Sequence, residues 1–168
     1  MIVKKGVLLV NLGSPDAPTK KAVKPYLDEF LMDKRVIDVP SALRALLVRG
    51  IILNVRPKRS AKAYAKIWWK EGSPLIVISE RFQKKVQEHT ELPVALGMRY
   101  GSMSIHKALA ELDAKGVEEV LLVPLYPHYA MSSYETVVVK ALEEQQKHFK
   151  HMKVSTLGAF YKSPDYIK

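Results

Sequence analysis

The chain has 168 residues, of which 48% are hydrophobic and 26% are charged, a balance typical of one globular domain. It contains no cysteine, which excludes disulfides and thiolate metal sites and fits a reducing compartment. The net charge is +10, but the basic residues are spread along the chain and no nucleic-acid motif accompanies them, so we predict no nucleic-acid partner.

The first half of the chain predicts one strand followed by several helices. Val7–Leu12 is apolar at almost every position, as in a strand buried on both faces of a parallel sheet. Thr19 could cap the next helix, although Pro25 favours a later start. Two further helices are expected on either side of Pro57, and a fourth follows the break at Gly72-Ser73-Pro74.

The second half returns to strands that alternate with single helices. Strands are predicted at Val94–Met98, Val120–Leu125 and Val154–Leu157, and helices at Ser104–Lys115 and Ser132–Phe149. Four apolar strands alternating with helices predict a three-layer α/β/α fold around a four-stranded parallel sheet. We expect one domain over residues 1–168, with a helical insertion at about residues 33–80.

The carboxyl ends of the predicted strands form the expected ligand edge, because open parallel sheets bind ligands there. This edge is rich in tyrosine and includes an arginine and a histidine; its segments are Asn11–Ser14, Met98–Gly101, Tyr126–Tyr129 and Gly158–Tyr161. Aromatic rings can stack on a planar ligand and arginine can pair with carboxylates, so the edge favours a planar, anionic, apolar ligand. The chain lacks a Walker loop, a dinucleotide fingerprint and a nucleophile elbow.

The histidines give weaker indications. His148 and His151 lie three apart near a helix end, where we interpret them as a basic helix terminus rather than a metal site. His128 follows a buried strand at the ligand edge, where it either contacts the ligand or is hydrogen-bonded within its loop. A single neutral imidazole supplies too few ligands for a stable metal site. We predict no metal site and no bound cofactor in this chain.

Four motifs, in order along the chain, resemble those of the ferrochelatase family. They are VLLVNLGSP at Val7–Pro15, YAKIWWKEGSP at Tyr64–Pro74, GMRY at Gly97–Tyr100 and YPHYAMSS at Tyr126–Ser133. Ferrochelatases insert Fe²⁺ into a porphyrin in haem biosynthesis, and the porphyrin lies between two similar domains. The resemblance implies that this chain is the N-terminal half, with Fe²⁺ and porphyrin as the substrates of the whole enzyme. Protoporphyrin and coproporphyrin both remain open as the substrate.

The resemblance also implies roles for individual residues. Leu12 would lie under the macrocycle, and Arg99 and Tyr100 would lie on the side of the ring opposite the metal-facing histidine. Three further residues would contact the porphyrin carboxylates: Arg56, Tyr64 and Ser73. With His128 from the ligand edge, these residues make up the predicted porphyrin-binding set.

Two family motifs do not occur in this sequence. The metal-side histidine lies in a Ser-Ala-His-Ser-type loop, and its partner glutamate lies in an Asp-His-x-Glu-type segment. We therefore assign no catalytic residue here, expect this chain alone to be inactive, and expect the family's missing C-terminal domain as its partner. Half-size chelatases carry a histidine where this chain has Asn11-Leu12. A homodimeric half-size tetrapyrrole chelatase and a non-catalytic tetrapyrrole-binding homologue remain as alternatives.

One region combines positive charge with apolar residues. Between Arg49 and Lys62, basic residues flank the apolar run Gly50–Leu53, a combination that suits an anionic amphiphile or a lipid surface. The resemblance implies that Leu43–Leu53 forms the lip of the porphyrin cleft. We expect a cytoplasmic protein with peripheral membrane contact through this segment, and a dimer that covers the exposed cleft wall.

Overall fold

The computed structural model describes residues 3–168, which divide into two compact units. The sheet unit holds residues 3–12, Ser79–Arg99 and Met103–Lys168, and the helical unit holds Gly13–Ile78 and Tyr100–Ser102. Each unit is described by itself. The prediction of one domain with an insertion at about residues 33–80 stays a prediction.

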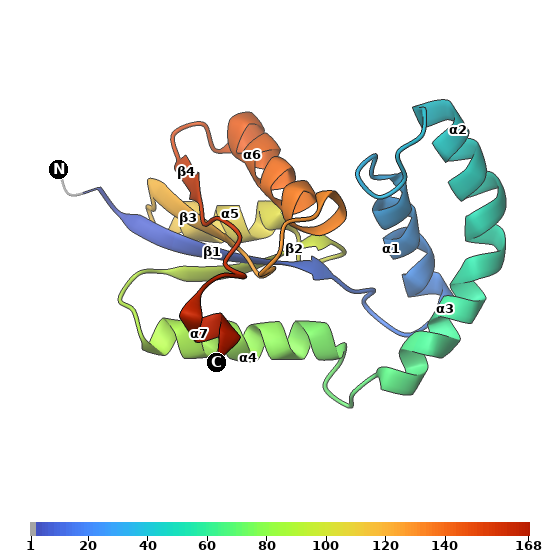
Figure 1. Cartoon of the computed structure of the whole chain (residues 1–168), viewed down its shortest axis with the longest axis horizontal. Helices are drawn as coiled ribbons and strands as arrows, with labels where there is room; N and C mark the ends of the chain where they lie inside the picture. The colour runs from blue at the N-terminus through green and yellow to red at the C-terminus, as the bar shows by residue number, and fades with distance from the viewer. Residues whose placement is uncertain (1–2) are drawn as a thin grey trace. The chain divides into compact units, whose positions relative to one another are not determined.

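A four-stranded parallel sheet forms the centre of the sheet unit (Figure 1). Its strands are β1 (Lys5–Gly13), β2 (Val94–Tyr100), β3 (Glu119–Pro124) and β4 (Lys153–Thr156), in the order β2-β1-β3-β4. The register pairs Val10 with Pro124 and Leu122 with Thr156. The central position of β1 explains its continuous apolar sequence, because helices cover both faces. The predicted fold class is confirmed.

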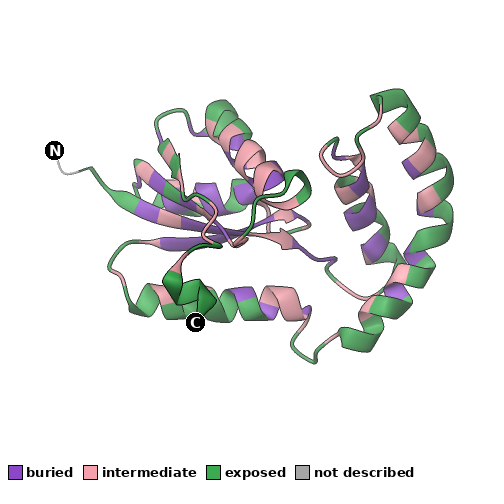
Figure 2. Ribbon diagram, in the orientation of Figure 1, coloured by how far each residue is buried: buried purple, intermediate pink, exposed green. Residues whose placement is uncertain are grey.

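Helices α5 (Ile105–Ala114) and α6 (Thr136–His148) cover one face of the sheet, and the part of α4 (Pro74–Glu88) from Ser79 onward, which belongs to this unit, covers the other (Figure 1). A π-helical turn, η2 (Met131–Glu135), leads into α6, and a short α7 (Pro164–Ile167) follows β4. The core contains residues of the inner strands and of α5, among them Leu8, Leu109 and Leu122, which are fully buried (Figure 2). A Cβ at Gly97 would lie 3.1 Å from the Ile105 Cα, so this glycine lets α5 pack closely on β2.

The helical unit consists of α1 (Lys20–Met32) and one long helical run. The run is made of α2 (Ser41–Ala45), the π-helical η1 (Leu46–Ile52) and α3 (Leu53–Ile67). Helix α1 packs against η1 and α3 and buries one face, which includes Tyr26, Leu27 and Leu31. Asn54 donates a hydrogen bond of 2.7 Å to the Gly50 carbonyl oxygen, which satisfies one acceptor in the π-helical turn.

Two expectations based on proline were wrong. Helix α1 begins at Lys20, directly after its cap Thr19, and Pro25 lies inside it. Lys21, whose carbonyl loses its N–H partner at Pro25, is exposed, so water can replace that hydrogen bond. Pro57 does not separate two helices, because the helical run continues through it. Its ring is buried within the helical unit, and this burial offsets the lost hydrogen bond.

Candidate functional site

The end of β1 is held by side-chain hydrogen bonds within the sheet unit. Leu12 is half-buried, and its amide N–H donates to the Asn11 side-chain oxygen at 2.8 Å. The Asn11 amide group in turn donates to the Ser79 hydroxyl of α4 at 3.3 Å. These contacts fix the backbone at the position where Leu12 reaches the carboxyl edge of the sheet.

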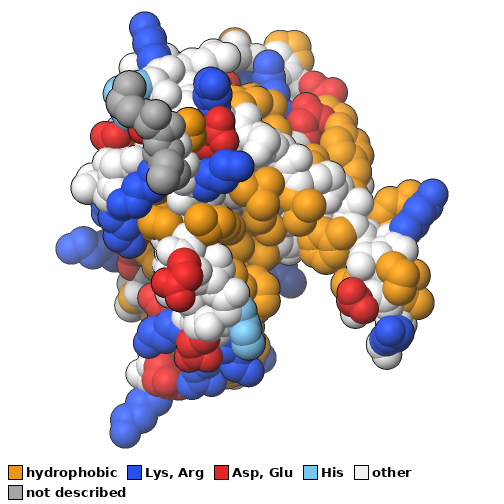
Figure 3. Space-filling model, turned by 90° about the vertical axis from the view of Figure 1, so that its left-hand side faces the viewer, with side chains coloured by type: hydrophobic (Ala, Val, Ile, Leu, Met, Phe, Trp, Pro, Cys, Tyr) orange, Lys and Arg blue, Asp and Glu red, His pale blue; other side chains and the backbone are white. Residues whose placement is uncertain are grey.

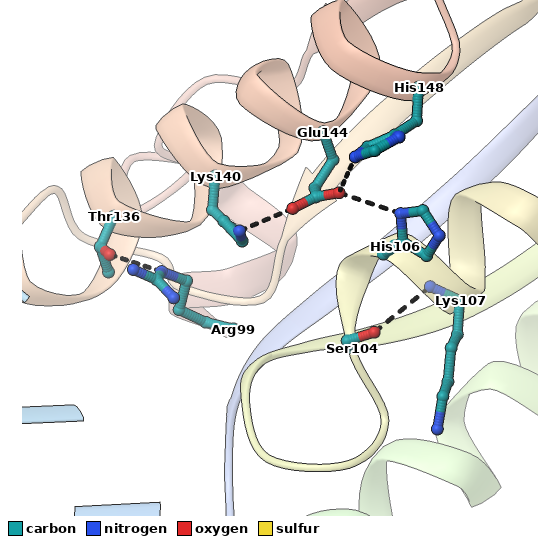
Figure 4. A network of polar contacts seen from close by, with 8 residues as sticks. All are labelled: Arg99, Ser104, His106, Lys107, Thr136, Lys140, Glu144 and His148. Carbon is teal, nitrogen blue, oxygen red and sulfur yellow. Dashed lines mark hydrogen bonds and ion pairs between the residues drawn. The ribbon is translucent and has the colours of Figure 1, made fainter. Parts of the chain in front are cut away.

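Arg99 lies at the carboxyl end of β2, the strand next to β1. Its Nε donates to the Thr136 hydroxyl at 2.7 Å, and Thr136, the first residue of α6, is buried (Figure 4). The structure therefore places Leu12 and Arg99 on the same edge, on neighbouring strands. The hydrogen bond to α6 restricts the guanidinium, so less side-chain entropy is lost when it binds an anion.

His128 is exposed in the loop after β3 and lies in a group of aromatic rings. It stacks on Tyr161, with ring centroids 5.3 Å apart and an interplanar angle of 22°. The Tyr161 amide donates to the Pro127 carbonyl oxygen at 2.9 Å, so the loops after β3 and β4 are joined. An exposed imidazole on a tyrosine ring is a flat surface of the kind that planar ligands use.

Arg56 and Tyr64 lie on α3 in the helical unit. Tyr64 is half-buried, with its ring edge-on to Tyr26 at 6.4 Å and to Trp68 at 6.2 Å. Burial raises the pKa of the Tyr64 hydroxyl, although a hydrogen bond with Tyr26 and the positive charge of Arg56 partly oppose this. Like other tyrosine hydroxyls, it is protonated at physiological pH and can donate a hydrogen bond. Arg56 is exposed on the same helix.

Ser73 and Tyr100 are buried inside the helical unit. The Tyr100 hydroxyl donates to the buried carboxylate of Asp33 at 2.9 Å, and its ring meets Phe30 edge-on at 5.2 Å. The Ser73 carbonyl oxygen accepts from the Val77 amide at 3.0 Å at the start of α4. The Tyr100 side chain is thus tied to α1 and to Asp33, and the predicted contact of both residues with a ligand stays a prediction.

Sequence reasoning missed a polar cluster between α5 and α6 (Figure 4). His106 of α5 and His148 of α6 both approach the carboxylate of Glu144, at 3.0 and 3.8 Å. The only sequence signal was the four-residue spacing of Glu144 and His148 on one helix face, since His106 lies 38 residues away in the chain. His151 contacts Asp113 instead, at 2.7 Å.

Positive and negative side chains are mixed on the face of the molecule drawn in Figure 3. Figure 3 shows a face on which Lys and Arg side chains are interspersed with Asp and Glu side chains, around a broad area of hydrophobic side chains. Within residues 3–168, no helix combines the length and apolarity that crossing a bilayer requires. The sequence expectation that the positive charge is spread out is consistent with this face.

The parallel α/β/α sheet defines a chelatase-like domain, and aromatic and basic side chains lie at its carboxyl edge. The sequence model of the ferrochelatase family matches residues 4–168. Curated ferrochelatases from Opitutus terrae and Azotobacter vinelandii are each 50% identical to this chain, over 98% and 96% of its length. The ferrochelatase from Stutzerimonas stutzeri is 47% identical over 99% of it.

This chain belongs to the ferrochelatase family. It spans about half the length of the curated relatives it matches, 48% to 49% for these three. The matched part is their N-terminal half.

Proposed function

We propose that this chain is the porphyrin-binding half of a ferrochelatase, an enzyme whose substrates are Fe²⁺ and a porphyrin. The observation that carries the proposal is the family match over residues 4–168, with about half of the residues identical to curated ferrochelatases. The carboxyl edge of the sheet supports it independently, because its side chains suit a planar anionic ligand.

The proposed reaction exchanges two pyrrole protons of the porphyrin for one ferrous ion. A free porphyrin is flat, and its inner nitrogens are crowded. Bending the ring turns a nitrogen lone pair outward, and the energy for this strain comes from binding the periphery of the macrocycle. The half that binds the porphyrin can therefore assist the chemistry without contacting the metal.

In the sheet unit, Leu12 is proposed to support the macrocycle from below. Arg99 is proposed to hold an acidic substituent, and its hydrogen bond to Thr136 presets the guanidinium. His128, stacked on Tyr161, is proposed to contact the ring periphery. Each of these side chains follows or ends a strand, so a rigid sheet sets its position.

In the helical unit, Arg56 is proposed to pair with a porphyrin carboxylate and Tyr64 to donate a hydrogen bond to one. A tyrosine hydroxyl is protonated at physiological pH, as a donor to an anion must be, and burial raises the pKa of Tyr64 further. Ser73 and Tyr100 are also proposed to belong to the porphyrin-binding set, and both are buried.

The proposal divides the reaction between two halves. No base that accepts the pyrrole protons is assigned in this chain, and neither the family's histidine motif nor its glutamate motif occurs in the sequence. The base and the metal-facing groups are proposed to come from the other half of the enzyme. This chain alone is accordingly proposed to bind porphyrin without inserting iron.

An anaerobic insertion assay tests the division. This chain, the full-length Opitutus terrae relative and that relative cut to the matched segment are each given porphyrin and Fe²⁺, and loss of porphyrin fluorescence is followed. We expect turnover only from the full-length relative, and porphyrin binding by all three proteins. Substantial turnover by this chain would contradict the division, and absence of porphyrin binding would contradict the proposed function itself.

A further inference from the structure

A second cluster of chemically competent side chains lies between α5 and α6, and the proposed function makes no use of it. The α5–α6 cluster consists of His106, Glu144 and His148, which the structure brings together within the sheet unit (Figure 4). Lys140 lies beside it, one helical turn before Glu144.

The potential ligand atoms of the α5–α6 cluster point toward one another. His106 Nδ1 lies 3.0 Å and His148 Nε2 lies 3.8 Å from the same Glu144 oxygen, Oε2. The three ligand atoms all lie within 4.8 Å of one another. Ligands bound at roughly 2.0–2.1 Å in a tetrahedron around Zn²⁺ are about 3.4 Å apart, so small side-chain rotations suffice to enclose an ion.

Helix packing holds the three groups in place. Glu144 and His148 are four residues apart and therefore share one face of α6. His106 lies in the first turn of α5, just after the cap Ser104. The Phe149 ring lies 5.4 Å from the His106 ring and 6.3 Å from the His148 ring, so it packs behind both imidazoles. Rigid support of this kind lowers the entropic cost of binding an ion.

The surroundings of Glu144 favour its ionised carboxylate, the form that can coordinate a metal ion. The residue is only 9% exposed, and this burial by itself disfavours ionisation. Hydrogen bonds from Lys140 and His106 to its two carboxylate oxygens offset this penalty. Lys140 Nζ occupies the other oxygen, Oε1, at 2.6 Å, so Oε2 is the oxygen directed to the two histidines. The histidine side chains are 47% and 52% exposed, which gives an ion access from solvent.

We propose that the α5–α6 cluster binds one divalent transition-metal ion, Zn²⁺ by preference, through His106 Nδ1, Glu144 Oε2 and His148 Nε2. Two imidazoles and one carboxylate are a ligand set that Zn²⁺ accepts, with water in the fourth position. Binding replaces the hydrogen bond between His106 and Glu144, and both imidazoles coordinate in their neutral forms. The site goes beyond the sequence prediction, which assigned no metal ligand to this chain.

Titration calorimetry with ZnCl₂, without porphyrin, tests the site. We expect one Zn²⁺ per chain and an affinity that falls at least about tenfold in His106→Ala and in His148→Ala. Both side chains are about half exposed, so the variants should fold, which far-UV circular dichroism checks. His151→Ala is the matched control, because it removes another exposed histidine that pairs with an acidic residue. Its Zn²⁺ affinity should equal that of the unchanged chain.

Co²⁺ in place of Zn²⁺ gives a second readout. The bound ion should show the intense visible absorption of a four-coordinate site, and the double variant His106→Ala/His148→Ala should lose it. A cluster of ion pairs that binds no metal would give no stoichiometric Zn²⁺ binding. That result would overturn the proposal, as would Zn²⁺ binding of equal strength in the double variant.

Discussion

Apolar side chains are mostly buried in the sheet unit, whereas many of those on the helical run Ser41–Ile67 are exposed. In the sheet unit, Leu8 and Leu122 are completely buried between helices. In the helical run, Leu46 is 66% and Val55 is 72% exposed, although both lie on well-formed helical turns. Figure 2 shows the same contrast, with buried residues concentrated in the strands and exposed residues along the long helix.

The difference in burial indicates different roles for the two regions, stability for the sheet unit and binding for the helical run. Burial of apolar area stabilises the sheet unit, whereas the exposed apolar side chains of the helical run contribute little to folding and remain available for binding. Basic residues next to them, including Arg49 and Arg56, favour an anionic apolar surface as the binding partner. The membrane contact predicted for Leu43–Leu53 remains a proposal on this basis.

The largest expected effect is in the core of the sheet. Leu122→Ala leaves a cavity between β3 and the covering helices and should lower the free energy of unfolding by about 2–5 kcal/mol. Its neighbour Leu121 is 40% exposed, so Leu121→Ala should cost far less. Urea denaturation followed by far-UV circular dichroism measures both. Equal losses in the two variants would show that the sheet does not bury its faces as described.

Three glycines give a graded series across the two units. Gly101 has φ +96°, and an added Cβ would lie 2.8 Å from the Ser14 carbonyl oxygen, so Gly101→Ala should destabilise by at least about 2 kcal/mol. Gly116→Ala meets only the backbone strain of φ +73° and should cost about 1 kcal/mol. Gly158→Ala has open space and should be nearly neutral.

Tryptophan fluorescence measures these effects on unfolding. Both tryptophans, Trp68 and Trp69, lie in the helical unit, which also contains Gly101. Their unfolding transition should move to lower urea in Gly101→Ala and move least in Gly158→Ala. The reverse order would contradict the close backbone contact between Gly101 and Ser14.

A smaller effect is expected on membrane binding. Leu46→Ser/Ile51→Ser removes two exposed apolar side chains and should weaken binding to vesicles that contain anionic lipids by about tenfold or more. Its effect on stability should be slight, because both side chains are exposed. Ile67→Ser, also exposed and on the same helical run, is the control and should bind like the unchanged chain. Vesicle sedimentation measures the binding, and identical binding by all three proteins would contradict a lip at Leu43–Leu53.

The smallest effect concerns Tyr64. Its pKa is raised in the folded chain, so its contribution to stability is complete below the unfolded pKa of about 10 and is lost as the pH rises above it. Tyr64→Phe should therefore lose less stability than the unchanged chain between pH 9 and pH 11. Tyr161→Phe, at an exposed ring, is the control. Thermal melts across this range measure the difference, and parallel curves for the unchanged chain and Tyr64→Phe would contradict the raised pKa.

The fold was largely predictable because its signals are local. Val7–Leu12 and Val120–Leu125 are short apolar runs, which favour strands of a parallel sheet, and the structure buries Leu8, Leu9 and Val10 of the first run while Leu121 of the second stays 40% exposed. The helix ends predicted from Pro25 and Pro57 were wrong. The sequence shows the hydrogen bond that each proline removes, but not that water can replace it near Pro25 or that burial of the Pro57 ring compensates for it. Packing decided both positions, and packing cannot be deduced from neighbouring residues in the sequence.

The candidate site was less predictable. The carboxyl edge with Leu12, Arg99 and His128 followed from the parallel sheet, and the structure places Leu12 and Arg99 at strand ends and His128 in the loop after β3. The burial of Tyr100 against Asp33 depends on residues 67 positions apart, and the meeting of His106 with Glu144 depends on the packing of α5 on α6. The sequence contains no pattern that relates such distant residues.

The central claim, that this chain binds porphyrin through the carboxyl edge of its sheet, is tested most directly by fluorescence titration of porphyrin. The unchanged chain should bind the porphyrin, and Arg99→Met should weaken binding by about tenfold, the loss of one charge-assisted contact. Arg81→Met removes an exposed arginine of α4 and should leave the affinity unchanged. Equal affinities of the unchanged chain and Arg99→Met, or failure of the unchanged chain to bind, would contradict the claim.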